Sequence, residues 1–369
     1  MKKILAAKQG SEQRHYDMIG NQEGQISEWE DGFRTDGADN TFEWWYFDSH
    51  LHDGSSLVIN FHSKDVFTPE KPLRPHVTFE LTSPEGKMIT LVAEAPVEEF
   101  KASKKTCNVH IGPCSFTGNL KEYKIHFEKD NVVADVTLTG KIKSFRIGNG
   151  FIYFGDHEEK YFAWLPSVPE GRVTADITID GIKTSYTGTG YHDHNWGNTS
   201  MANIVHHWYW GRAKVGNYNV ISVKFITEAI YGFTPLTNFM LAENNEIVVL
   251  TDTTDRSLSI TTSDEYIDEL TKKPVHNVLV YEYNNGEKHY RVTYKRKGDI
   301  AKVKMVDLLT PEEKAMALQA GFNGAYLRFI GDVTVDKFSN GKIIDTITAS
   351  SAIWELMYFG DPSAYHEKK

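Results

Sequence analysis

Short runs of alternating apolar and polar residues, separated by glycine turns, set the strongest limit on how this chain can fold. Residues 57–61, 132–138 and 173–179 are runs of this kind, each rich in Val, Ile or Leu. Turn dipeptides fall between such runs, at Asp53-Gly54, Asp180-Gly181, Asn285-Gly286 and Asn340-Gly341. Pairs of this type between alternating runs are a strong hairpin signal, because tight hairpin turns need a left-handed backbone. The sequence therefore predicts a mostly β protein with antiparallel strands and few short helices.

One helix is marked near the carboxyl end. Thr310 can cap it, Pro311 suits its first position, and Glu313 lies three residues after the cap. This is a capping box with a proline start, and Gly321 can end the helix. We expect a helix over about residues 311–320.

The chain length and an internal repeat predict two domains. Domains usually contain about 100–200 residues, and the chain has 369. Trp45-Tyr46-Phe47 aligns with Trp208-Tyr209-Trp210 at an offset of 163, and residues 57–59 then meet residues 220–222 without a gap. We expect an N-terminal arm over residues 1–38, one β domain over 39–202, and a second over 203–369.

The charge balance argues against nucleic acid as a partner. The chain has 40 basic and 50 acidic residues, and its formal net charge is -10. Nucleic acid binding needs a dominant basic surface that neutralises phosphates. The two cysteines, Cys107 and Cys114, lack the spacing of a structural zinc site, and the sequence leaves open whether they pair.

Signals for export or for membrane insertion are weak. The apolar run Ile4–Ala7 is shorter than the 7–15 residues or so of a signal peptide core. No stretch approaches the roughly 20 apolar residues of a spanning helix. We expect a cytoplasmic protein, and the sequence leaves open both peripheral membrane contact and the oligomeric state.

Residues 188–197, Gly-Thr-Gly-Tyr-His-Asp-His-Asn-Trp-Gly, form the densest group of polar and titratable side chains. Side chains alternate between the two faces of a strand. Alternation places Tyr191, Asp193 and Asn195 on one face and His192, His194 and Trp196 on the other. We expect one face to line a cavity and the other to anchor the strand.

Three interpretations of this motif compete. In the first, Asp193 is an acid or base whose pKa is raised in an aromatic cavity, and Tyr191 orients it. In the second, His192 and His194 bind zinc with His206 or His207 as a third ligand. In the third, the motif is a buried polar network that joins the two halves.

Two aromatic segments are candidates for substrate contacts. In residues 42–48, alternation separates Glu43, Trp45 and Phe47 from Trp44, Tyr46 and Asp48, and one set would line a cavity. The alternative is a tryptophan-rich core strand. In residues 206–212, His206, Trp208, Trp210 and Arg212 share a face. Lys224 follows on the next apolar strand. It could point into a cavity, although alternation favours an outward direction. The predicted substrate-binding residues are Glu43, Trp45, Tyr46, Asn195, Trp196, His206, Trp208, Trp210 and Lys224.

Familiar signatures of nicotinamide binding, nucleotide-phosphate binding and serine hydrolases are missing from the sequence. We find no glycine-rich dinucleotide fingerprint, no phosphate-binding loop and no Gly-x-Ser-x-Gly elbow. The sequence therefore demands no cofactor.

The aromatic segment and the central motif together resemble a known family. Glu43-Trp44-Trp45-Tyr46-Phe47, Gly190-Tyr191-His192-Asp193-His194-Asn195-Trp196-Gly197 and, at the carboxyl end, residues 352–357 are similar to the hydroxyneurosporene synthase (carotenoid 1,2-hydratase) family. The resemblance extends to lipocalin-like relatives of the AttH type and to fungal lipocalin-type Diels–Alderases. It implies two lipocalin-like barrels with a deep pocket and cofactor-free chemistry on an apolar, unsaturated substrate. It also implies that Tyr191 and Asp193 protonate a double bond.

Two functions from different classes follow. The first is an enzyme that hydrates, cyclises or isomerises a hydrophobic unsaturated molecule of terpenoid, polyene or polyketide type. Asp193, Tyr191, His192 and His194 would form its catalytic group. The second is a lipocalin-like carrier that binds a lipophilic ligand without chemistry. The titratable cluster favours the enzyme, because an apolar ligand does not need one.

Overall fold

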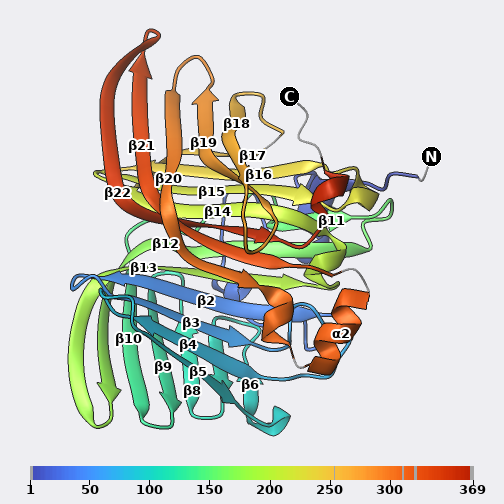
Figure 1. The fold of residues 1–369 in the computed structure, drawn as a ribbon, viewed down its shortest axis with the longest axis vertical. Helices are drawn as coiled ribbons and strands as arrows, with labels where there is room; N and C mark the ends of the chain where they lie inside the picture. The colour runs from blue at the N-terminus through green and yellow to red at the C-terminus, as the bar shows by residue number, and fades with distance from the viewer. Residues whose placement is uncertain (1–2, 253, 310, 320–321, 366–369) are drawn as a thin grey trace. The chain divides into compact units, whose positions relative to one another are not determined.

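The computed structural model describes residues 3–252, 254–309, 311–319 and 322–365. It divides into two compact units, one of residues Lys8–Met201 and one of Met1–Ala7 with Ala202–Lys369. The residues that the sequence suggested as a separate arm thus belong mostly to the first unit. Each unit contains one curled antiparallel sheet in a half-barrel form (Figure 1). The mostly β, lipocalin-like fold class predicted from the sequence is confirmed.

The sheet of the first unit has the strand order β5-β4-β3-β2-β13-β12-β10-β9-β8-β7-β6, and β11 pairs with both β12 and β1. The elements of this part are β1 (Ala7–Gln9), α1 (Gln13–Ile19), η1 (Glu28–Asp31), β2 (Phe42–Leu51), β3 (Ser56–His62), β4 (His76–Thr82), β5 (Met88–Glu94), η2 (Val97–Glu99), β6 (Phe100–Ala102), β7 (Asn108–Ile111), β8 (Cys114–Gly118), β9 (Glu122–Lys129), β10 (Val132–Gly140), β11 (Phe151–Phe154), β12 (Lys160–Ile179) and β13 (Ile182–Gly197). Of the strands in this order, β2 comes first in the sequence and β13 last, and the two pair with each other.

The sheet of the second unit has the order β17-β16-β15-β14-β22-β21-β20-β19-β18. Its elements are η3 (Met201–Asn203), β14 (Val205–Val215), β15 (Tyr218–Thr227), η4 (Ala229–Tyr231), β16 (Pro235–Glu243), β17 (Glu246–Asp252), β18 (Leu258–Ile267), β19 (Pro274–Asn284), β20 (His289–Lys304), η5 (Met305–Leu308), α2 (Pro311–Gln319), β21 (Ala325–Ser339), β22 (Lys342–Tyr358) and η6 (Pro362–Ala364). Here too the first strand, β14, lies against the last strand, β22.

The two sheets share a strand order in which β14–β17 correspond to β2–β5, and β22 corresponds to β13. This supports the internal repeat. The gapless alignment is nevertheless shifted by one residue on the first strand. Trp45 is in the core of its sheet, whereas its aligned partner Trp208 is only partly buried and Tyr209 takes the core position.

Alternation explains how each sheet forms its core. On β3, Leu57, Ile59 and Phe61 are fully buried, while the residues between them are partly exposed. The predicted turns also form. Asp180-Gly181 and Asn340-Gly341 both have positive φ at the two turn positions, as tight hairpins require. At the other two dipeptides the glycines, Gly54 and Gly286, have positive φ.

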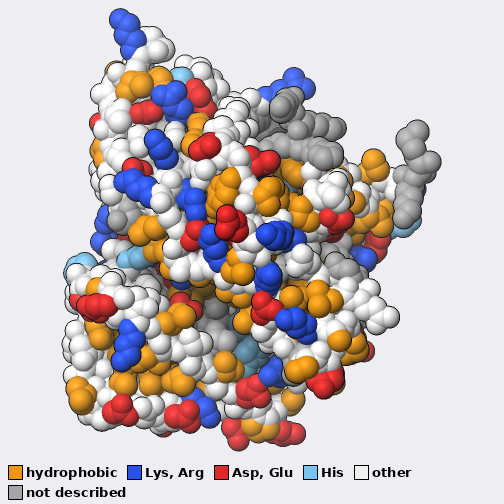
Figure 2. Space-filling model, in the orientation of Figure 1, with side chains coloured by type: hydrophobic (Ala, Val, Ile, Leu, Met, Phe, Trp, Pro, Cys, Tyr) orange, Lys and Arg blue, Asp and Glu red, His pale blue; other side chains and the backbone are white. Residues whose placement is uncertain are grey.

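The remaining expectations have mixed outcomes. The helix near the carboxyl end forms over Pro311–Gln319, whereas Thr310 and Gly321 lie outside the described residues. Cys107 and Cys114 are both buried free thiols. No helix in the described ranges is long and apolar enough to cross a membrane. On the face shown in Figure 2, basic and acidic side chains are interspersed.

Candidate active site

Strand β13 carries the central motif between its two neighbours, β2 and β12. The two histidines of the motif point into the core of the first unit, where His194 stacks on Trp45 with ring centroids 4.7 Å apart. His192 contacts the rings of Phe116 and Tyr123. Tyr191, Asp193 and Asn195 lie on the opposite face of the strand. The two faces that alternation predicted are therefore present.

Asp193 is the centre of a buried hydrogen-bond cluster, with only 6% of its surface exposed. Its Oδ2 accepts a hydrogen bond from the Tyr191 hydroxyl at 2.7 Å and another from the Trp164 indole Nε1 at 2.7 Å. Its Oδ1 accepts one from the Asn195 amide, also at 2.7 Å. Trp164 arrives on β12, directly opposite Asn195. Sequence reasoning did not identify Trp164, because only strand pairing brings residue 164 to residue 193.

The environment of Asp193 favours its protonated form. Burial raises the pKa of Asp193, and the hydrogen bonds from Trp164 and Tyr191 oppose this rise without cancelling it. Burial, together with the nearby Asp193 carboxyl group, raises the pKa of Tyr191 well above its usual range, so this phenol stays protonated and donates. Oδ2 already has two donors and Oδ1 has one. The open hydrogen-bonding position of the carboxyl group is therefore at Oδ1.

The aromatic strand β2 places one predicted residue on the face of Asp193 and two on the other face. Tyr46 is directly opposite Asp193 in the strand register, and its hydroxyl donates to Asp48 Oδ2 over 3.1 Å. Glu43 and Trp45 instead point into the interior. Strand alternation thus turns Glu43 and Trp45 away from Asp193, and their substrate-binding role stays a prediction.

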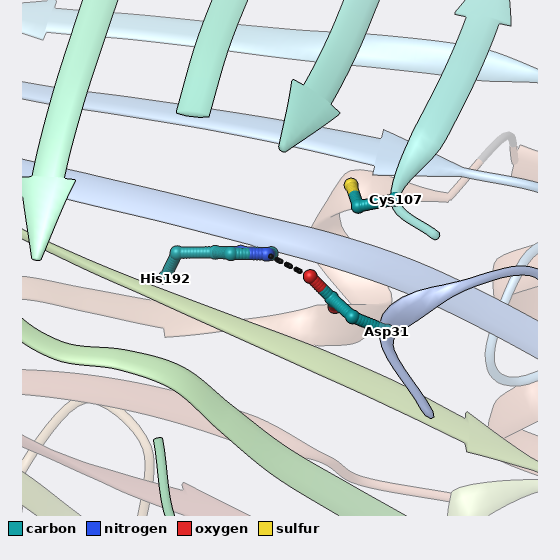
Figure 3. A group of neighbouring side chains, drawn as sticks. All are labelled: Asp31, Cys107 and His192. Atoms are coloured by element: carbon teal, nitrogen blue, oxygen red, sulfur yellow. Dashed lines mark hydrogen bonds and ion pairs between the residues drawn. The ribbon is translucent and has the colours of Figure 1, made fainter. Parts of the chain in front are cut away.

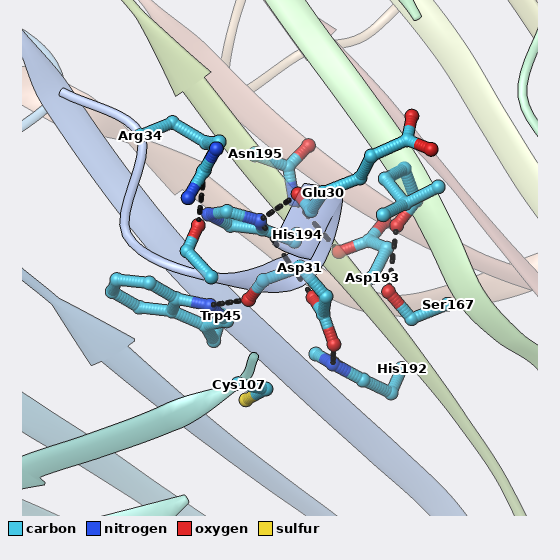
Figure 4. A network of polar contacts seen from close by, with 12 residues as sticks. Glu30, Asp31, Arg34, Trp45, Cys107, Ser167, His192, Asp193, His194 and Asn195 are labelled. Atoms are coloured by element: carbon cyan, nitrogen blue, oxygen red, sulfur yellow. Dashed lines mark hydrogen bonds and ion pairs between the residues drawn. The ribbon is translucent and has the colours of Figure 1, made fainter. Parts of the chain in front are cut away.

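A second polar cluster lies on the interior face and centres on Asp31, from η1 (Figure 4). Asp31 Oδ2 accepts a hydrogen bond from the Tyr123 hydroxyl at 2.5 Å and is 3.2 Å from His192 Nε2. The backbone oxygen of Asp31 accepts from the Trp45 indole at 3.1 Å. Burial alone would raise the pKa of Asp31, but His192 and its other partners bring it below its usual value. Asp31 is therefore an ionised anchor for the motif strand.

His194 has its own carboxylate partner in this cluster. Its Nε2 is 2.8 Å from Glu43 Oε1, and the two carboxylate oxygens of Glu43 also accept the backbone N–H groups of Arg34 and Thr35. These contacts connect the motif strand to the segment just after η1. The sequence missed Asp31 because it lies about 160 residues before the motif. The contacts of His192 with Asp31 and of His194 with Glu43 agree best with a supporting role for the two histidines.

The side chains that could bind a metal differ from the histidines that the zinc interpretation proposed. Ligand atoms of Asp31, Cys107 and His192 lie within 4.8 Å of one another, and all three side chains are buried (Figure 3). The Asp31 oxygen that faces His192 also accepts a hydrogen bond from the Tyr123 hydroxyl. Burial raises the pKa of the Cys107 thiol. A cysteine binds zinc as a thiolate, so zinc binding by this trio would require Cys107 to lose its proton. His206 and His207 lie in the second unit, and their Nδ1 atoms are 2.7 Å apart.

The other predicted substrate contacts lie on several faces. Trp196 packs with Ala163 and Leu165 in a small apolar cluster. Trp208 and Trp210 are partly buried on β14, and His206 is fully buried. The outward direction favoured for Lys224 is wrong. This residue is only 6% exposed, and it is opposite Tyr209, a core residue of the second sheet.

Comparison with known proteins identifies curated relatives of part of the chain. The quinolone epoxide rearrangement protein asqO of Emericella nidulans is 26% identical over 200 residues, which is 49% of this chain and 53% of that protein. The hydroxyneurosporene dehydrogenase of Chlorobaculum tepidum is 24% identical over 212 residues, 47% of this chain and 54% of that protein. The chain thus spans about half the length of these relatives.

Solved structures share the fold over most of the chain. CghA, determined with Sch210972, has a TM-score of 0.60 at 13% identity and covers 88% of this chain and 89% of its own. Kievitone hydratase from Nectria haematococca has a TM-score of 0.54 at 14% identity and covers 97% of this chain and 98% of its own. At these identities the likeness concerns the fold alone.

A sequence profile covers more of the chain than either curated relative does. The profile of the Diels-Alderase-like family matches residues 38–273, which include the aromatic strand β2, the motif strand β13 and Trp164. The match extends over more than half of the chain. The chain belongs to the Diels-Alderase-like family.

Proposed function

We propose that this protein is an enzyme that uses Asp193 as a general acid on an apolar, unsaturated small molecule. The observation that carries the proposal is the buried carboxyl group of Asp193 with three hydrogen-bond donors. Burial favours the neutral acid before reaction. The three donors bind the carboxylate more strongly than the acid, because hydrogen bonds to an ionised acceptor are the stronger ones.

The proposed step begins with the proton on Oδ1, the oxygen with the open position. The proton passes to one carbon of a substrate double bond, and the other carbon becomes electron-poor. Tyr191 and Trp164 stabilise the carboxylate that forms, and they do so in the transition state more than in the ground state. In the first outcome, water adds to the electron-poor carbon and passes one of its protons to the carboxylate. In the second, another double bond of the substrate closes a ring, and the resulting cation loses a proton to the carboxylate. In the third, a proton from a neighbouring carbon returns to the carboxylate without addition. These outcomes are hydration, cyclisation and isomerisation.

The relatives support this class of reaction without choosing among its members. One is named for an epoxide rearrangement, one solved structure is a hydratase, and the family itself is named after Diels–Alder chemistry. Acids assist epoxide opening and double-bond hydration, and hydrogen-bond donors assist ring closure. Asp193 with its three partners offers both capabilities.

The deciding experiment compares the wild type with Asp193→Asn. The purified proteins are incubated in D₂O with a panel of aryl alkenes, isoprenoid alkenes and conjugated polyenes, and products are resolved by mass spectrometry. Protonation of a double bond leaves deuterium on carbon, so we expect the wild type to form a deuterated product. Asp193→Asn should lose turnover by about 10²–10⁴-fold, the usual contribution of a general acid.

The matched control is Asp135→Asn, which removes an exposed carboxylate from β10 of the same sheet. It should keep full turnover. Circular dichroism and thermal unfolding establish that each variant is folded. A folded Asp193→Asn protein that turns over like the wild type would overturn the proposal, and uptake of a panel member without any product would favour the carrier instead.

A further inference from the structure

The face of Asp193 continues across β2, β3 and β4 as a row of partly exposed side chains. Tyr46 is opposite Asp193, and Asn60 is opposite Tyr46. One row further along, Trp44 is opposite His62, and His62 is opposite His76. We call Trp44, Asn60, His62 and His76 the shelf. All four are partly exposed, in contrast to the core residues next to them on the same strands.

Three members of the shelf form a continuous stack of flat rings. The centroids of Trp44 and His62 are 6.4 Å apart at an interplanar angle of 28°, and those of His62 and His76 are 4.6 Å apart at 6°. Burial lowers the pKa of His76 and takes the pKa of His62 well below its usual value. Both imidazoles are therefore neutral near pH 7. Stacking of another flat ring on these neutral, partly exposed rings is more favourable than their contact with water.

Asn60 adds a polar point within this surface. Its Oδ1 is buried, and it has no hydrogen-bond partner among the described residues. The neighbouring hydroxyl of Tyr46 does not serve it, because that hydroxyl donates to Asp48. Unpaired buried polar atoms are uncommon, since they lose their hydrogen bond to water on folding. On the same face as Asp193 and two strands away, an unpaired acceptor leaves a place for a donor supplied by a ligand.

From this arrangement we infer that the shelf binds the planar part of the substrate, a conjugated or aromatic ring system carrying a hydroxyl or N–H group that donates to Asn60 Oδ1. Neighbouring strands are about 4.8 Å apart, so Asn60 lies two strand spacings, roughly 10 Å, from the strand of Asp193. The donor and the reacting double bond of the substrate are therefore separated by a similar length. This inference rests on the proposed function for its reacting group, but its binding contacts are independent of Asp193.

The test uses two probes that share one ring system. 2-Naphthol is flat and carries one hydroxyl donor, and 2-methoxynaphthalene has the same rings without the donor. We expect the wild type to bind 2-naphthol about tenfold more tightly in calorimetric titration, the usual order for one hydrogen bond. Asn60→Leu should abolish this preference, so that the two probes bind with about equal affinity. Asn60→Asp keeps an acceptor and should keep the preference. Trp44→Ala should weaken both probes equally.

Asn108→Leu is the matched control, because it removes an exposed amide from β7 of the same sheet. It should bind both probes like the wild type. Equal affinity of the two probes for the wild type, or an unchanged preference in a folded Asn60→Leu protein, would overturn the inference. Asp193→Asn separates the two proposals. If it loses turnover while the shelf shows no preference, the shelf is wrong and the general acid stands. If it keeps turnover while the preference holds, the reverse is true.

Discussion

The indole nitrogen of Trp164 donates a hydrogen bond to Asp193 Oδ2 over 2.7 Å, from a neighbouring strand and across 29 residues of sequence. The Tyr191 hydroxyl reaches the same oxygen from within the motif, also at 2.7 Å. Both donors act on the oxygen that does not carry the proton in the proposed step. They orient the Asp193 carboxyl group, and they oppose the rise in its pKa that burial causes.

Trp164→Phe tests the acidity directly. The variant keeps an aromatic ring and removes the donor, so the pKa of Asp193 should rise further, because the carboxylate loses stabilisation. The active form is the acid, and activity falls as pH rises through this pKa. The alkaline limb of the pH profile should therefore move to higher pH, and the maximal rate should fall about 10- to 100-fold. A lower rate with an unmoved alkaline limb would show that Trp164 only supports the fold.

Tyr191→Phe and Tyr46→Phe form a matched pair on one face of the first sheet. The Tyr191 hydroxyl bonds to Asp193, whereas the Tyr46 hydroxyl bonds to Asp48. Tyr191→Phe should reduce kcat about 10- to 100-fold, because a charge-assisted bond is lost in the transition state. Tyr46→Phe should leave kcat within about threefold of the wild type. Equal losses in the two variants would contradict the assignment of Tyr191.

Asp31→Asn tests the interior anchor. Asp31 is ionised and paired with His192 and Tyr123, and breaking such a buried pair costs about 3–5 kcal/mol of unfolding free energy. Denaturant titration of the variant measures this loss. Asp135→Asn, which breaks an exposed pair with His126 at 2.8 Å, should cost about 0–1 kcal/mol.

The same pair predicts a pH dependence. The pKa of Asp31 in the folded protein is below its ordinary value of 3.8. A depressed carboxyl pKa contributes stability that is present above the unfolded value and is lost as pH falls through the folded one. The stability difference between the wild type and Asp31→Asn should therefore shrink below about pH 4. A difference that stays constant down to pH 2 or so would show that Asp31 is not ionised.

Lys273 offers a prediction in the second unit. It is 1% exposed, its Nζ is 3.3 Å from the Gly360 backbone oxygen, and burial lowers its pKa from 10.5 to about 8. The unfolded chain binds this proton more tightly, so stability should rise between about pH 8 and pH 10.5. Lys273→Met should remove that rise and stabilise the protein at pH 7 by up to about 3 kcal/mol. Lys214→Met, at an exposed position, should change neither quantity.

The sequence alone was sufficient for the features that depend on local pattern. Alternation along β13 separated Tyr191 and Asp193 from His192 and His194, because the side-chain period of a strand is fixed at two. The dipeptides at residues 180–181 and 340–341 predicted hairpins, because their backbone demands are local. The repeat of aromatic strands predicted two related sheets.

Only the tertiary structure decided which partners meet. Trp164 reaches the motif because β12 pairs with β13, and Asp31 reaches it because η1 lies beside β13. Neither arrangement can be recognised from the residues of β12 or η1 alone. The direction of Lys224 was predicted wrongly for a related reason. Alternation defines two faces of a strand, but which face is buried depends on the sheet that forms around it. The motif at residues 190–197 can thus be recognised in the sequence, whereas the burial of Asp193 and its bond from Trp164 depend on the fold.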